Sequence, residues 1–192
     1  MRTLLVALLA TLAPVASGAS TIVFGSDSAS QCARAAILGH TDSGSEDWCD
    51  RALQDDMLNT GDRAKTFVNR GVMKLGRGEY EPARTDFEAA LALTPKLPEA
   101  LLNRGAVWVG EGKYQAAIAD LSRAIELNTD QPEKAYFDRA LAYEGLDDMK
   151  SAYFDYVKAQ ALKPGWAAPQ RELTRFHVSP SSAVPPPTST AG

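Results

Sequence analysis

Apolar residues recur at helical spacing through most of the chain, in segments that end at glycine, proline or a polar turn. This pattern predicts an all-α fold. The expected helices span residues 29–38, 46–57, 64–75, 81–93, 98–109, 115–127, 133–144, 149–162 and 167–176.

Residues 64–166 contain the same pattern three times. Gly71, Gly105 and Ala140 mark one position in successive copies, at separations of 34 and 35 residues. Three further series keep the same offsets: Ala83, Ala117 and Ala152; Phe87, Leu121 and Tyr156; Ala90, Ala124 and Ala159. A fixed period of this length predicts a stacked array of helix pairs, in which neighbouring pairs complete a core that no pair buries alone.

These repeated positions resemble the tetratricopeptide repeat family, in an exported bacterial form. The resemblance rests on the small residues, the paired alanines, an aromatic near the inter-helix turn and a closing proline. The aromatic and closing positions are Tyr80, Tyr114 and Met149, and Pro95, Thr129 and Pro164, where Met149 and Thr129 depart from the pattern. The resemblance implies an α-solenoid of three units, at 64–97, 98–132 and 133–166. A degenerate helix pair at 19–63 and a helix at 167–177 are expected to cap its ends.

The first 18 residues have the order of a secretory signal peptide. A positive start at Arg2 precedes a mostly apolar run from 4 to 15, and Ala16-Ser17-Gly18 supplies small residues for cleavage. The alternative is a membrane anchor, but the run is too short to cross about 30 Å of hydrocarbon as a helix. We therefore expect an exported mature chain without a stable membrane anchor, most readily periplasmic, with an extracellular location as the alternative. The Pro-, Ser- and Thr-rich residues 178–192 are expected to be disordered.

Cys32 and Cys49 are the only cysteines, and they fall on the two helices expected before the repeats. In an oxidising compartment such a pair favours a structural disulfide. The alternative, a redox-active pair, usually has C-x-x-C spacing, which is absent here. We expect the disulfide to hold together the N-terminal cap.

Two charged positions recur in every unit. Arg70, Arg104 and Arg139 hold one, and Asp86, Asp120 and Asp155 hold the other, 16 residues later. The two series can meet within a helix pair or between neighbouring pairs. Either arrangement predicts a structural ladder of arginine–carboxylate contacts. Ligand contact by these residues is the alternative.

A third polar position, just before the arginines, holds Asn69, Asn103 and Asp138. In the resembled family the first helix of each pair lines a concave face, and asparagines at this position contact peptide backbone. An amide suits that role because it donates and accepts, whereas the carboxylate of Asp138 only accepts. The alternative is that these are ordinary exposed polar residues.

The same helices carry an apolar stripe. Its members are Val68, Val72, Leu102, Ala106, Phe137 and Leu141. An apolar groove with polar positions would suit a peptide or a partner helix. Alternatively, the stripe belongs to the core or is covered by the protein's own termini. Family members that grip a C-terminal carboxylate use lysine and asparagine on this face; Lys65 and Lys134 are in place, but Glu99 stands between them, so we do not expect that clamp.

Composition narrows the function classes further. The formal charge is −4 without a basic block, which argues against nucleic acid as a partner. The sequence shows no Ser-His-acid set, phosphate loop or metal-ligand cluster, so we expect no enzyme, cofactor or metal. We predict a non-catalytic protein–protein interaction module of the cell envelope that binds a peptide or protein segment in its groove. The alternative is a structural or assembly factor that acts through its whole surface.

Overall fold

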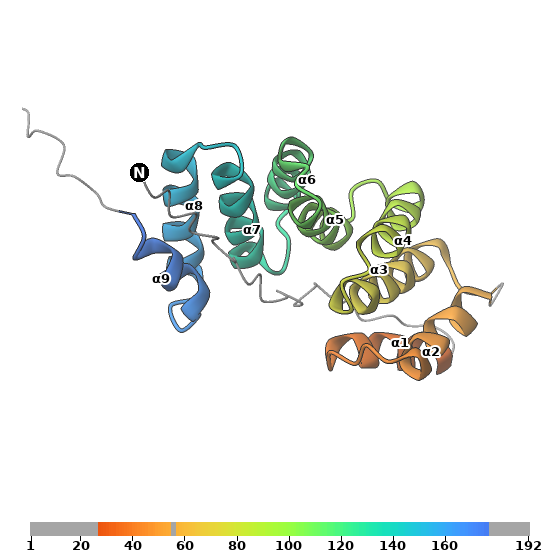
Figure 1. Ribbon diagram of the computed structural model, residues 1–192. Helices are drawn as coiled ribbons and strands as arrows, with labels where there is room; N and C mark the ends of the chain where they lie inside the picture. Colours follow the sequence, from red (N-terminus) through yellow and green to blue (C-terminus); the bar gives the residue numbers. More distant parts are fainter. Residues whose placement is uncertain (1–26, 55–56, 177–192) are drawn as a thin grey trace, which may run out of the picture.

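The computed structural model describes residues 27–54 and 57–176, and within them every regular element is an α-helix. The helices form a row of antiparallel pairs, as Figure 1 shows. Their bounds are α1 Asp27–Ile37, α2 Ser43–Gln54, α3 Thr60–Gly76, α4 Tyr80–Leu93, α5 Pro98–Gly110, α6 Tyr114–Glu126, α7 Pro132–Glu144, α8 Met149–Leu162 and α9 Ala167–Leu173. The predicted all-α stack of helix pairs is confirmed.

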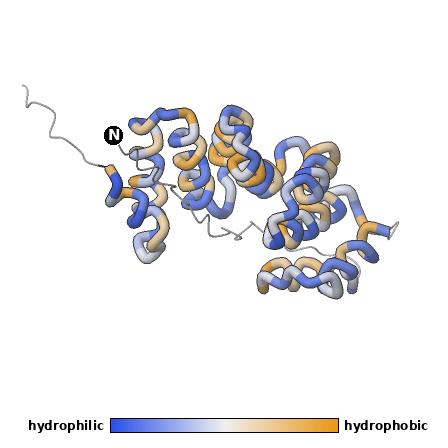
Figure 2. The backbone as a smooth tube through the Cα atoms, viewed as in Figure 1, coloured by the Kyte–Doolittle hydropathy of each residue, from blue (hydrophilic) through white to orange (hydrophobic). Residues whose placement is uncertain are grey.

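Packing follows the order of the chain. The pairs α3–α4, α5–α6 and α7–α8 make the three units, and α1–α2 form a further pair before them. Contacts of α2 with α3, α4 with α5 and α6 with α7 join each pair to the next, while α9 packs on α8. Hydrophobic and hydrophilic residues alternate along the helices (Figure 2), as expected when each helix buries one side against its neighbours.

The recurring small residues are where two helices of a pair approach most closely. A Cβ atom added to Gly71 would lie 2.6 Å from the ring of Phe87, and one added to Gly105 would lie 2.6 Å from Leu121. Phe87, Leu121 and Tyr156 are fully buried at the same position of successive units. The close approach therefore lets one large side chain per unit fill the core between the helices.

The turn inside each unit uses one residue in the left-handed region. Gly78 and Gly112 have φ of +77° and +71°. Asp147 takes the same place in the third unit with φ of +60°, a conformation that aspartate tolerates better than most side chains do. The three turns are therefore alike although the third lacks a glycine there.

Several helix ends differ from the sequence-based prediction, and α2, at Ser43–Gln54, begins and ends three residues before the expected 46–57. Helix α3 begins at Thr60 and not at the expected residue 64, because Asn59 caps that helix by accepting from the Asp62 amide at 2.9 Å. At the other end, α9 stops at Leu173, short of the predicted end at 176.

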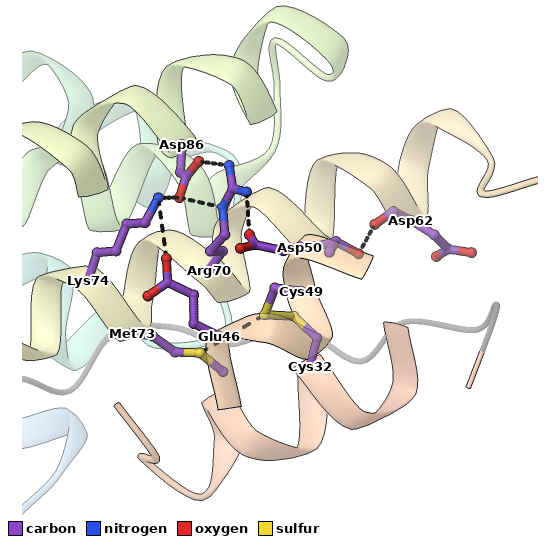
Figure 3. Close-up of a disulfide and its surroundings, with 10 residues drawn as sticks. Cys32, Glu46, Cys49, Asp50, Asp62, Arg70, Met73, Lys74 and Asp86 are labelled. Carbon is purple, nitrogen blue, oxygen red and sulfur yellow. Dashed lines mark hydrogen bonds and ion pairs between the residues drawn. A yellow bond between two sulfur atoms is a disulfide. The ribbon is translucent and has the colours of Figure 1, made fainter. Parts of the chain in front are cut away.

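The N-terminal pair is held by the predicted disulfide between Cys32 of α1 and Cys49 of α2 (Figure 3). Their Cα atoms are 4.8 Å apart, within the range that a disulfide spans. Both cysteines are fully buried, and Met73 of α3 packs its sulfur 3.9 Å from that of Cys49. The disulfide is thus part of the contact between the cap and the first unit.

The predicted signal peptide, residues 1–18, and the predicted disordered tail, residues 178–192, lie outside the described residues. Within the described ranges, no helix is both long and apolar enough to cross a membrane.

Candidate functional site

Each unit contains one bidentate arginine–aspartate pair that joins its two helices. Arg70 donates from Nε to Asp86 at 3.0 Å and from Nη2 at 2.5 Å. The second and third units repeat this geometry, with Nε and Nη2 distances of 2.7 and 2.8 Å for Arg104–Asp120, and 2.7 and 2.9 Å for Arg139–Asp155. The predicted ladder is therefore confirmed, and its contacts lie within each pair.

A third donor supports the aspartate in two of the units. Lys74 Nζ lies 2.9 Å from Asp86 (Figure 3), and Trp108 Nε1 donates to Asp120 at 3.0 Å. Lys74 and Trp108 hold the same position, three residues after Gly71 and Gly105. The buried carboxylates thus receive three donors, which offsets the cost of removing them from water.

The arginines also reach back to the preceding pair. Arg70 Nη1 lies 2.7 Å from Asp50 of α2, and Arg139 Nη1 donates to Ser122 of α6 at 2.9 Å. Hydrogen bonding to Asp120 is the main cause that raises the pKa of Arg104, so its charge is permanent. The ladder links helices within and between units, and these contacts occupy the guanidinium nitrogens and carboxylate oxygens of its residues. We therefore assign the arginine–aspartate ladder a structural role.

The first helices of the three units are neighbours: α3 contacts α5, and α5 contacts α7. We call the side of these helices that carries Asn69, Asn103 and Asp138 the first-helix face. A second series on it, one residue after the small position of each unit, is Val72, Ala106 and Leu141, and all three are half-buried. They keep accessible surface at one equivalent place in every unit.

Other members of the predicted apolar stripe lie deeper. Val68 and Leu102 belong to the central core, and Phe137 packs its ring 5.5 Å from Tyr156 and 4.8 Å from Trp166, between centroids. All three are buried. Their role in the described structure is core packing, as the alternative interpretation of the stripe expected, and contact with a partner stays a prediction for them.

The three polar residues of the first-helix face differ in exposure. Asn69 and Asn103 are buried, and Asn103 Nδ2 donates to the carbonyl of Glu99 at 2.9 Å. The alternative that they are ordinary exposed polar residues is therefore wrong for these two. Asp138 is half-buried, and loss of water around its carboxylate raises its pKa to about 7, although Lys134 acts in the opposite direction. Partner binding by the three residues remains a prediction.

Sequence reasoning missed a contact that sets the spacing between units. The ring of Tyr80 packs over Gly110 at the end of the next unit's first helix, where an added Cβ would lie 2.6 Å from it. Tyr114 packs over Gly145 in the same way. The sequence does contain a signal for this contact, because a tyrosine and a glycine recur at equivalent positions of successive units. Only their placement on successive pairs shows that they touch.

A pocket near the end of the stack lies away from the first-helix face. It has a volume of about 250 Å³ and is lined by Glu144, Met149, Arg175 and Phe176. Met149 holds the position of Tyr80 and Tyr114, and Arg175 is paired with Glu144 at 2.7 Å. In the part of the chain that the structure describes, no three His, Cys, Asp or Glu side chains gather as a metal site.

Comparisons with known proteins agree with the stack of helix pairs. Residues 133–165 match the sequence family described as "Tetratricopeptide repeat". No curated protein sequence matches. The Arabidopsis OM64 TPR domain is 21% identical with a TM-score of 0.58, covering 61% of this chain and 96% of its own.

Two further solved structures are similar to this chain. The second TPR domain of human RPAP3, in complex with the HSP70 peptide SGPTIEEVD, is 25% identical with a TM-score of 0.55, covering 61% of this chain and 97% of its own. MamA from Desulfovibrio magneticus RS-1 is 20% identical with a TM-score of 0.62, covering 77% and 82%. Residues 133–165 therefore match a tetratricopeptide repeat, and the stack of helix pairs has the same fold as these tetratricopeptide repeat structures.

Proposed function

We propose that this protein is an interaction module that binds an extended peptide or protein segment along the first-helix face. The observation that carries the proposal is the half-buried apolar series Val72, Ala106 and Leu141, which occupies one position of three adjacent helices. A repeated series of this kind offers a linear ligand equivalent apolar contacts at each unit. The ladder behind it fixes the helices and so preorganises the face.

The similar structures support this proposal. The second TPR domain of human RPAP3 was solved with a nine-residue HSP70 peptide, and it resembles 61% of this chain. The first TPR domain of Spaghetti was solved with an HSP90 peptide, SRMEEVD. Peptide binding is a property of those domains, and we extend it to this chain as a proposal.

The test is to block the face without disturbing the core. Ala106→Arg places a long charged side chain on the half-buried middle of the face, and Ala119→Arg places the same side chain at an exposed site on α6. We expect peptides selected from an immobilised library by the wild-type protein to lose binding to Ala106→Arg and to keep it with Ala119→Arg. Equal binding by both variants, with unchanged melting, would contradict a ligand on this face.

A second candidate function, assembly through the wider surface, is favoured by the outer side of α8. Phe154 and Val157 are 58% and 40% exposed there. The equivalent residues of α4 and α6 are small or polar: Thr85 and Glu88, and Ala119 and Ser122. If Phe154→Ser abolishes partner association while Ala106→Arg does not, the assembly function is the correct one.

We further propose that the chain is exported and works in the cell envelope. The order of residues 1–18 supports export, and a buried disulfide in the cap suits an oxidising compartment. Alkylation of thiols in intact cells, followed by mass spectrometry, should find Cys32 and Cys49 protected. Deletion of residues 2–18 should leave both cysteines reactive in the cytosol. Free thiols in the wild-type protein would contradict export.

A further inference from the structure

The helix α8 presents apolar residues on both of its sides. Its inner side buries Ala152, Tyr156 and Ala159. On its outer side, four exposed residues follow one another at helical spacing and form what we call the α8 stripe: Lys150, Phe154, Val157 and Ala161. A helix that is apolar on both sides is typical of one that packs on both sides, so the stripe indicates a partner.

Phe154 is held in place although 58% of it is exposed. Its ring packs edge-on against Tyr153, 5.8 Å away between centroids, and Tyr153 in turn lies 5.7 Å from the ring of Phe176. An aromatic side chain fixed in this way loses little freedom when a partner covers it, and aromatic rings are enriched at the centres of interfaces. Phe154 is therefore suited to anchor an apolar ligand.

The stripe is also positively charged. Lys150 and Lys158 are exposed on the outer side of α8, and neither forms an ion pair in the described part of the chain. The position of Lys150 is occupied by Glu81 on α4 and by Gln115 on α6, so it becomes positive at the third unit. The two lysines are eight residues apart, which is about 12 Å along a helix.

The nearby carboxylates do not neutralise this charge. Asp155 is buried and receives both hydrogen bonds from Arg139. Asp148 lies at the start of α8 and caps it, and hydrogen bonding with Ser151 is the main cause that lowers its pKa, whereas Lys150 contributes least. The body of the stripe therefore combines apolar residues with two lysines that lack a carboxylate partner.

These charges select among possible occupants. A second copy of the chain would bring the lysines of two stripes into one interface, where like charges repel. Segments that recruit anionic lipid carry about four to eight basic residues, more than the stripe has. A helix with apolar residues on one side and carboxylates beside them satisfies both the rings and the lysines.

We propose that the α8 stripe is a docking surface for an acidic amphipathic helix of a partner protein. Apolar residues of that helix pack on Phe154 and Val157, and its carboxylates pair with Lys150 and Lys158. The proposal rests on the second candidate function, assembly, and gives the chemistry of its partner. It does not depend on peptide binding at the first-helix face.

The experiment measures binding of two helical probes to the full chain by fluorescence anisotropy at low ionic strength. One probe is AEALLEALAEALLEALA, and the other has lysine at each glutamate position; both are acetylated and amidated. We expect the acidic probe to bind at least tenfold more tightly, and Lys150→Glu with Lys158→Glu to lower that ratio at least tenfold. Lys96→Glu with Arg123→Glu makes the same change of charge at exposed sites outside α8 and should leave the ratio within twofold. Circular dichroism checks that all variants melt as the wild-type protein does.

Two further variants separate this proposal from the others. Ala106→Arg should bind the acidic probe as the wild-type protein does. Loss of binding in Ala106→Arg, with binding kept when both lysines are reversed, would place the probe on the first-helix face and overturn the proposal while supporting peptide binding. If Phe154→Ser weakens both probes equally and the lysine reversals change nothing, the acidic partner is overturned and assembly through an apolar surface stands. Equal binding of both probes by the wild-type protein also overturns the proposal.

The remaining occupants have their own readouts. Sedimentation that shows a wild-type dimer and a Phe154→Ser monomer would assign the stripe to a second copy. Phe154-dependent binding to phosphatidylglycerol vesicles, without binding of the acidic probe, would assign it to a membrane. Binding of the acidic probe only by a chain that ends at residue 176 would assign it to the protein's own C-terminal residues. Each of these three results overturns the proposal.

Discussion

Arg104 grips Asp120 across the second helix pair with two hydrogen bonds, at 2.7 Å from Nε and 2.8 Å from Nη2. The aspartate is buried, and its third donor is the indole of Trp108. The pair recurs in all three units, so the carboxylate at this position depends on arginine wherever it occurs. The arginine–aspartate ladder therefore holds the two helices of each unit at a fixed separation.

We expect Arg104→Ala to lower the free energy of unfolding by about 3 kcal/mol, because it leaves the buried carboxylate of Asp120 without its main partner. Arg123→Ala, which removes an exposed pair with Glu126, is the control and should cost less than about 0.5 kcal/mol. Chemical denaturation measures both. A melting curve of Arg104→Ala that matches wild type, together with lost peptide binding, would reassign this arginine to ligand contact.

Gly71→Ala should destabilise the first unit by about 1–3 kcal/mol, despite the better helix propensity of alanine. The new Cβ would lie 2.6 Å from the ring of Phe87, which is fully buried, so either the ring or the helix must shift. Gly61→Ala is the matched control, because its added Cβ would meet only Asn59, at 3.4 Å. Thermal unfolding followed by circular dichroism compares the two variants. Equal unfolding midpoints would show that the contact between the two helices adjusts to the added methyl group without loss of stability.

Removal of the disulfide by Cys32→Ala with Cys49→Ala should cost about 3 kcal/mol in the N-terminal cap, from the chain freedom that a 17-residue separation allows. Because units interact mainly with their neighbours, the loss should be local. Hydrogen exchange should accelerate in α1 and α2 and change little in α7 and α8. Uniform acceleration across the stack would show that the cap supports every unit.

Asp138→Asn should raise the free energy of unfolding at pH 8 by on the order of 1–2 kcal/mol, allowing for the part of the side chain that water reaches. The pKa of Asp138 in the folded protein, about 7, lies above its ordinary 3.8, so the folded state holds an extra proton between these values. This contribution is fully present below pH 4 and is lost as the pH rises through 7. The difference between wild type and variant should therefore shrink toward pH 4, and a constant difference would contradict the raised pKa.

Local spacing in the chain was enough to specify the helix pairs. Gly71, Gly105 and Ala140 recur at separations of 34 and 35 residues, and the 16-residue step from arginine to aspartate spans the end of one helix, a turn and the first half of the next. Such features depend on neighbours in the sequence, so the fold, the disulfide and the ladder followed from residue order. The misplaced start of α3 depended on the side-chain cap of Asn59, which short-range patterns describe less well.

The exposure of each side chain depends on how neighbouring units pack. Val72 and Val68 share a helix and a hydropathy, yet one keeps accessible surface and the other lies in the core. The same is true of Asp138 and Asn103, which hold one repeat position with different exposure. Exposure depends on how the next helix pair is set, through contacts such as Tyr80 on Gly110, and no local pattern encodes that placement. Residue order therefore determined which helices form and pair, whereas the stacking of the units decided which residues of the first-helix face a ligand can reach.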